Sequence, residues 1–204
     1  MKLLCVSDTV VPQLESASNL RRRYSDVDLI VSCGDMPAAY LDYISSILGK
    51  PLLYVRGNHD EMYTTEPPGG IDLHNNLFEY KGVSFIGLEG SIQYNNGPIQ
   101  YTQHEMRMKV LQLAPRLRYN RWKRGYGVDV FVTHSPPKGI HDADDLPHQG
   151  FSAFLDFLTW YRPRYMIHGH VHTWDRRKVV DTQYKHTRIL NINPYYLLTV
   201  EPVE

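Results

Sequence analysis

The sequence is poor in cysteine and contains no long apolar run. Its two cysteines, Cys5 and Cys33, are too few for a disulfide framework. Both fall in expected buried strands, so we interpret them as reduced core thiols in a cytoplasmic protein, with a redox pair or metal ligation as the alternative. No apolar run approaches the roughly 20 residues of a spanning helix, and we expect no membrane partner. The N-terminus enters a strand pattern directly, which predicts no signal peptide.

The chain also lacks an excess of charge of either sign. It has 22 Lys and Arg residues against 22 Asp and Glu residues, so its overall charge recruits neither nucleic acid nor a membrane. No linker, repeat or low-complexity segment interrupts it. The length of 204 residues and the hydrophobic content of 42% indicate one globular domain over residues 1–204.

Several short apolar runs end in residues that can ligate metals. Each run has the length and composition of a buried strand, and the reactive residues follow directly. In chain order, the runs and the residues that follow them are Lys2–Ser7 before Asp8, Leu29–Cys33 before Gly34-Asp35, Leu52–Val55 before Gly57-Asn58-His59-Asp60, Val128–Thr133 before His134, and Tyr165–Ile167 before Gly169-His170-Val171-His172. This repeated build makes the set much more specific than any one of its members.

The segments between the first three runs have helical patterns. We expect helices over Leu14–Tyr24 and over Ala38–Leu48, the second of which Gly49 should end. Alternation of strand and helix predicts a parallel sheet. Ligands of such sheets bind beyond the carboxyl ends of the strands, and the candidate residues fall there.

The second half of the chain has weaker patterns. Thr102 and Glu105 predict a capping box, and the helix they begin should end or kink at Pro115. The basic segment Arg107–Arg124 carries Tyr119 and Trp122 and is compatible with a nucleic-acid patch, but we favour a solvated helix face followed by a basic loop. The other expected elements are a strand over Val83–Leu88, a helix over Gln149–Tyr161, and short antiparallel strands at Val179-Val180, Thr187–Ile192 and Leu197–Val200.

The candidate residues offer oxygen and imidazole ligands without cysteine. That set suits Mn²⁺, Fe or Zn²⁺ in a hydrolytic site. Asp35 has two oxygens and can bridge two cations, and Asn58 can ligate through its amide oxygen. His170 and His172 are two residues apart, so in extended backbone they point to opposite sides and can reach different metals. Two metals about 3.5–4 Å apart polarise a phosphoryl group and share a hydroxide nucleophile.

From Asp8 to His172 this ordered set resembles the calcineurin-like metallophosphoesterase family, and most closely its small phosphodiesterase-like members. The resemblance implies an α/β fold with two packed, mostly parallel or mixed β-sheets flanked by helices. It also implies two divalent metal ions, Mn²⁺ foremost, with Fe, Zn²⁺ or Ni²⁺ as alternatives. The implied ligands are Asp8, Asp35 and His172 for one metal and Asp35, Asn58, His134 and His170 for the other, while His59 contacts the phosphate and protonates the leaving oxygen, and Asn58 also faces the substrate.

One position departs from the family pattern. The first motif of the family is Asp-x-His, and here it reads Asp8-Thr9-Val10. Because valine cannot bind a metal, we expect the first site to lose a ligand, which water or the loop residues His141 or His148 could replace. Asp60 is expected to organise its own loop rather than to partner His59.

These patterns predict a metal-dependent phosphoesterase acting on a small, nucleotide-like phosphodiester or phosphomonoester. The loss of an imidazole at Val10 favours an alternative, a binding or scaffold protein that keeps the fold with weak or no catalysis. Retention of His59 and of six metal-ligand positions opposes it, since a scaffold does not need them. A nuclease is a further alternative, and it rests on the basic segment alone.

Overall fold

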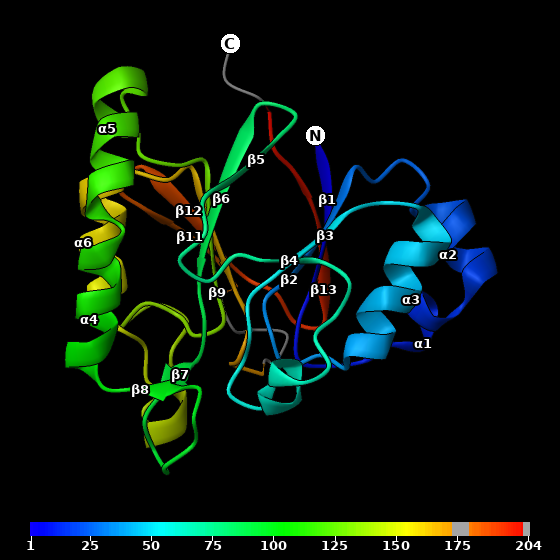
Figure 1. Ribbon diagram of the computed structural model, residues 1–204, viewed down its shortest axis with the longest axis horizontal. Coiled ribbons are helices and arrows are strands. Elements are labelled where there is room, and N and C mark those ends of the chain that lie inside the picture. The colour runs from blue at the N-terminus through cyan, green and yellow to red at the C-terminus, as the bar shows by residue number, and fades with distance from the viewer. Residues whose placement is uncertain (173–179, 202–204) are drawn as a thin grey trace.

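The computed structural model describes residues 1–172 and 180–201 and forms four layers, with two β-sheets packed face to face between two groups of helices (Figure 1). The first sheet has the strand order β13 (Tyr195–Thr199), β1 (Lys2–Val6), β2 (Leu29–Ser32), β3 (Leu52–Tyr54), β4 (Ile71–Asp72). Strands β1 to β4 are parallel, and β13 pairs antiparallel with β1. The predicted parallel arrangement of the first three strands is therefore confirmed.

The second sheet also has a parallel centre with antiparallel edges. Its order is β11 (Asp181–Tyr184), β12 (Thr187–Asn191), β10 (Tyr165–His168), β9 (Val130–Thr133), β6 (Val83–Leu88), β5 (Phe78–Tyr80). The four central strands run parallel, and β11 and β5 are antiparallel to their neighbours. A short parallel pair, β7 (Ser91–Ile92) and β8 (Gln100–Tyr101), stands apart from both sheets.

Helices cover the outer face of each sheet. The helices over the first sheet are α1 (Pro12–Glu15), α2 (Ala17–Arg23) and α3 (Ala38–Leu48), and those over the second are α4 (Gln103–Gln112), α5 (Ala114–Arg124) and α6 (Ser152–Tyr161). Two short 3₁₀ turns, η1 (Glu61–Thr64) and η2 (Leu146–His148), lie in connecting loops. Among the described residues, no helix is long and apolar enough to cross a membrane.

Three apolar layers hold these elements together. Adjacent residues of β1 point in opposite directions, so Leu3 packs between the sheets with Phe85, while Leu4 packs under the helices with Leu41. The third layer joins the second sheet to its own helices through Phe131 and its neighbours. Because both faces of each sheet are covered, the central strands are buried along their whole length, as their apolar sequences predict.

Several predicted helix boundaries are confirmed. Gly49 ends α3 in the left-handed conformation, at φ 61°. Thr102 and Glu105 form the capping box of α4. The prediction of one helix over Leu14–Tyr24 is wrong, because Ser16 is extended and its side chain caps α2 by accepting the N–H of Asn19. A serine that bonds to nearby backbone competes with helix continuation in this way.

Other boundaries differ from the prediction. Residues Ala114–Arg124 form helix α5 rather than a basic loop, because Pro115 occupies the first turn of a new helix, where its missing N–H costs nothing. Helix α6 begins at Ser152, since Phe151 is extended and pairs with Pro137.

The C-terminal strands are partly as predicted. The edge strand falls on Asp181–Tyr184, so Val180 precedes it, and Val179 lies outside the described residues. The antiparallel expectation is right for β11 with β12 and for β13 with β1, but β12 runs parallel to β10.

Candidate metal centre

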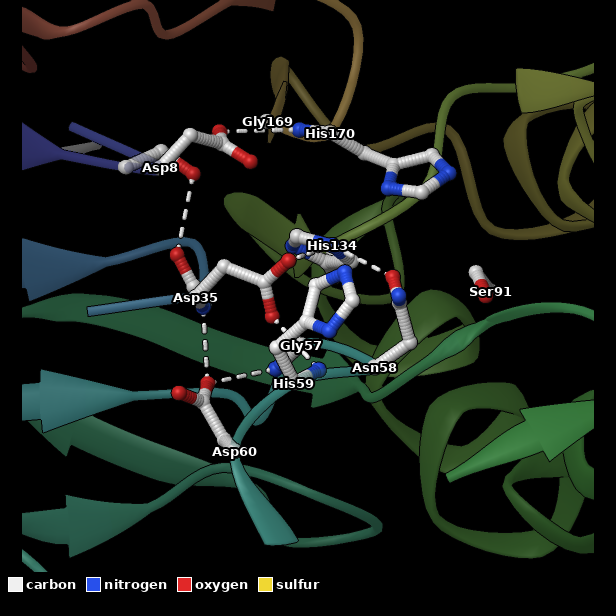
Figure 2. Close-up of polar contacts among 12 residues, drawn as sticks. Asp8, Asp35, Gly57, Asn58, His59, Asp60, Ser91, His134, Gly169 and His170 are labelled. Atoms are coloured by element: carbon white, nitrogen blue, oxygen red, sulfur yellow. Dashed lines mark hydrogen bonds and ion pairs between the residues drawn. The ribbon is translucent and has the colours of Figure 1, made fainter. Parts of the chain in front are cut away.

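The candidate residues lie where strands of both sheets end. Asp8 follows β1, Asp35 follows β2, and the Gly57–Asp60 loop follows β3 in the first sheet. His134 and His170 follow β9 and β10 in the second sheet. The parallel strands deliver these residues to one edge of the sandwich, and Figure 2 shows their side chains converging from separate loops.

Asp35, His134 and His170 form the core of the site. Their ligand atoms all lie within 4.8 Å of one another, and both histidines are buried. The Nε2 atom of His134 is 3.3 Å from Asp35 Oδ2 and 3.1 Å from the amide oxygen of Asn58. The imidazole rings of His134 and His170 have their centroids 4.7 Å apart. Four predicted ligands of one metal are therefore brought together.

Backbone carbonyls fix the tautomers of both histidines. His134 Nδ1 lies 2.8 Å from the carbonyl oxygen of Cys33, and His170 Nε2 lies 2.7 Å from that of Pro147. A carbonyl oxygen only accepts, so these two nitrogens carry the protons. The remaining nitrogens, His134 Nε2 and His170 Nδ1, are left as lone-pair donors to a metal. This second-layer hydrogen bonding is the usual support of metal-ligating histidines.

The site as built requires a positive charge. His134 Nε2 faces two oxygens, of Asp35 and Asn58, which cannot donate to it. Burial alone would lower the pKa of His134, but the adjacent carboxylate of Asp35 raises it to about 9. Burial opposes ionisation of Asp35, yet the same pairing with His134 holds the pKa of Asp35 well below its usual range. A divalent cation can take the place of that proton, and the nitrogen and oxygen atoms present fit one.

The first predicted metal site is less complete. Asp8 directs Oδ2 to the backbone N–H of His170 at 2.9 Å, and burial raises the pKa of its carboxyl group. Within residues 1–172 and 180–201, Asp8, Asp35 and His172 do not form a second cluster of converging ligand atoms like that of Asp35, His134 and His170. The ligand atoms of Asp35, His134 and His170 therefore lie close together, whereas those of Asp8, Asp35 and His172 do not form such a cluster.

The replacements considered for the missing imidazole do not join the cluster. Val10 is 37% exposed and offers no ligand atom. His141 contacts His168 Nε2 at 3.0 Å and the Thr182 hydroxyl at 2.9 Å, so both its ring nitrogens are engaged. His148 contacts Asp145 through Nδ1, although its ring centroid is 5.0 Å from that of His170. Neither histidine belongs to the cluster around Asp35.

The backbone is strained at three of the candidate ligands. Asp8, Asp35 and His170 have φ angles of 63°, 55° and 69°. These angles lie in the left-handed region, which residues other than glycine rarely adopt. Such residues persist only where their surroundings hold them, and they concentrate at functional sites. Glycine meets the need for space, since a Cβ on Gly57 would lie 2.0 Å from Asp35 Oδ1.

The loop after β3 places His59 at the opening of the site. Its backbone N–H donates to Asp35 Oδ1 at 2.9 Å, and its ring is exposed. A surface cavity of about 450 Å³ is lined by Asp35, His59 and, from η1, Met62 and Tyr63. Asp60 Oδ2 accepts the backbone N–H groups of Asp35 and Gly57, so Asp60 organises this loop as predicted. Its pKa is raised to about 6, mainly by burial.

The sequence analysis missed two features next to the candidate ligands: Tyr94, and the ion pair between Arg56 and Glu89. The side-chain NH₂ of Asn58 donates to the Tyr94 hydroxyl at 3.2 Å, which turns the amide oxygen toward His134. Tyr94 stands in a segment that reads only as a turn. Arg56, directly before the site loop, pairs with buried Glu89 at 2.6 Å. No sequence pattern predicts the pairing of Arg56 with Glu89, because Arg56 follows a strand of the first sheet and Glu89 follows a strand of the second.

Comparison with known proteins supports the fold and the family. The family model described as calcineurin-like phosphoesterase matches residues 1–174. A solved structure, TT1561 of Thermus thermophilus, superposes with a TM-score of 0.62 at 16% identity, covering 97% of this chain and 93% of that one. A single mutant of Vps29 from Entamoeba histolytica gives 0.49 at 12% identity, covering 99% and 87%. No curated protein matches the chain.

Proposed function

Because the chain belongs to the calcineurin-like phosphoesterase family, we propose that it is a metal-dependent hydrolase of a small phosphodiester. The observation that carries this proposal is the convergence of Asp35, Asn58, His134 and His170. Each of the two buried imidazoles donates one ring N–H to a backbone carbonyl, and both rings offer a ligand atom within 4.8 Å of the Asp35 carboxylate. This arrangement supports their assignment as ligands of a cation.

The residues divide into two ligand sets that share Asp35. Asn58, His134 and His170 would complete the closely built site, and Asp8 and His172 the more open one. When bound, divalent cations polarise a phosphoryl oxygen and make a water molecule more acidic. Mn²⁺ is the ion we expect, with Fe, Zn²⁺ or Ni²⁺ as alternatives that the ligand types also allow.

His59 is the candidate for proton transfer. Its ring is exposed beside the cavity that also contains Asp35, so it can reach a substrate that enters there. We assign to it the protonation of the departing oxygen, a general-acid role. Asn58, fixed by Tyr94, keeps its amide at the border between the ligand set and the substrate. A nucleotide-like phosphodiester is the expected substrate.

One observation favours a second candidate function, a binding or scaffold protein with little catalysis. Val10 supplies no imidazole, and neither His141 nor His148 replaces it in the cluster. A protein of this kind would bind at most one cation tightly and turn over slowly at every metal concentration. The nuclease alternative gains no support from the basic segment, because α5 precedes the start of β9 and His134 follows its end, at opposite ends of that strand.

The deciding experiment is hydrolysis of a generic aryl phosphodiester by the purified chain with added Mn²⁺ and with a chelator. The proposal expects turnover that chelation removes and Mn²⁺ restores. The control is His134→Ala, which removes one proposed ligand and should be inactive under both conditions. Absence of turnover across a series of divalent metals would favour the binding protein instead.

A further inference from the structure

Helix α5 carries a concentration of basic and aromatic residues that the metal centre does not use. Its sequence has five basic residues and no acidic one, although the whole chain is neutral. Only Leu117 of this helix is buried. The side chain of Trp122 is 83% exposed and that of Tyr119 is 60% exposed. Large exposed aromatics beside a local excess of positive charge mark a surface that binds a partner.

A hollow beside α5 gathers these features. It has a volume of about 590 Å³, and side chains from three helices line it: Leu111 of α4, Arg118, Arg121 and Trp122 of α5, and Trp160 and Tyr161 of α6. Figure 1 shows α4, α5 and α6 together on the outer face of the second sheet. The hollow therefore lies on the helical layer, separate from the loops that carry the metal ligands.

The polar groups of this hollow are almost all donors. The guanidinium groups of Arg118 and Arg121 and the indole N–H groups of Trp122 and Trp160 can only donate, and only the Tyr161 hydroxyl can also accept. The backbone carbonyl of Trp160 is already occupied by Arg121. Phosphate oxygens of a nucleic acid and carboxylates of an acidic peptide can both accept from these donors, but only the nucleic acid also brings flat bases that stack on the exposed rings of Trp122 and Tyr119. The lining thus favours a nucleic acid over a peptide.

In the described part of the chain, no acidic side chain lines the hollow to neutralise the positive charge of its arginines. Among residues 1–172 and 180–201, the ion pair of α5 joins Arg124 to Glu79, and Arg118 has no acidic partner. A flexible single strand can place its phosphates on these cations while its bases stack on exposed aromatic rings, which is how sequence-tolerant single-strand binding works. We propose that the surface formed by α5 and this hollow binds single-stranded nucleic acid at a site distinct from the metal centre.

The test is binding of a fluorescently labelled ten-nucleotide oligothymidine to the full chain, followed by anisotropy at several salt concentrations. Binding should weaken as salt rises, because each neutralised phosphate releases counterions. Arg118→Glu and Trp122→Ala should each weaken it by roughly 10-fold, and Trp122→Phe should retain much of it through stacking. Both positions lie on the surface of the helical layer, and thermal melts check that the variants fold.

The matched control is Arg21→Glu, which makes the same charge change on α2, where the arginines are exposed and the neighbouring aromatic residue, Tyr24, is buried. It should leave binding unchanged. Equal loss in Arg21→Glu and Arg118→Glu would reduce the effect to overall charge and overturn the proposal. Displacement of the oligonucleotide by polyglutamate at equal charge concentration would assign the surface to acidic protein segments, and absence of binding at low salt would also overturn it.

Discussion

Asp60 Oδ2 accepts the backbone N–H of Asp35 at 2.7 Å, and the same oxygen accepts the N–H of Gly57 at 2.7 Å. One carboxylate oxygen thus ties the loop after β2 to the loop after β3. Since Asp35 has a φ of 55°, this bond helps to hold a strained backbone in place. Asp60 is a positioning residue, which acts on the proposed metal ligand Asp35 through its backbone N–H and is not part of the cluster of ligand atoms.

This relationship predicts different outcomes for two substitutions. Asp60→Ala leaves two N–H groups without a partner, at a cost of about 1–3 kcal/mol for each, and should weaken metal binding together with stability. Asp60→Asn can place an amide oxygen where Oδ2 stands, so it should keep most of both. Metal titration and urea unfolding of the two variants check this. Equal loss in both would mean that the negative charge matters and the hydrogen bonds do not.

Substitution of His59 should affect proton transfer and leave metal binding intact. We expect His59→Ala to keep its metal content while turnover falls by roughly 10²–10⁴, the usual size of a general acid contribution. The loss should shrink with substrates whose leaving groups need less protonation. Rates across a series of aryl phosphodiesters decide this, and a constant loss along the series would show that His59 only positions the phosphate.

Val10 predicts two unequal metal sites. The set Asp35, Asn58, His134 and His170 should fill first, and the set with Asp8 and His172 should bind weakly for want of one imidazole. Val10→His should tighten the weak site and lower the metal concentration needed for half of the maximal activity. Val10 is 37% exposed, so an imidazole there should not be forced into the core. Two equally tight sites in the unmodified chain, measured by metal titration, would contradict this account.

The partly buried imidazole of His74, which is not one of the proposed metal ligands, predicts a pH dependence of stability. Burial, with nearby Lys109 adding to it, lowers the pKa of His74 to about 4, against about 6.5 in an unfolded chain. The unfolded state therefore binds the additional proton as the pH falls from 6.5 toward 4, and stability is lost over that window. Compared with His74→Gln, the unmodified chain should lose up to about 2 kcal/mol more between pH 7 and pH 5. Urea unfolding of both at the two pH values measures this, and parallel losses would refute it.

The positions of the central strands and the residues at their ends could be predicted from the sequence because buried parallel strands have continuous apolar sequences. The residues at which helices begin and end were harder to predict from the sequence. Ser16 fits a helical pattern as well as it fits a cap, and Pro115 can end one helix or begin another. Propensity alone does not choose between these, since the packing of Leu14, Leu20 and Leu117 decides.

The ligand set around Asp35 was also predictable, because parallel strands bring their ends to one edge. That these residues bind a metal stays a prediction, as does the single-domain organisation of residues 1–204. The groups that hydrogen-bond to these candidate ligands and orient them could not be predicted. Tyr94 comes from a turn, and the carbonyls of Cys33 and Pro147 that orient the histidines are backbone groups with no sequence signature.

The central claim is that Asp35 joins a cation-binding set on which hydrolysis depends. The most direct measurement is the metal content and the phosphodiesterase rate of the same Asp35→Asn preparation, beside the unmodified chain, after saturation with Mn²⁺ and removal of free metal. The account predicts that Asp35→Asn loses bound metal and activity together, because this carboxylate serves both proposed sites. A variant that retains two metals per chain and a near-normal rate would contradict it.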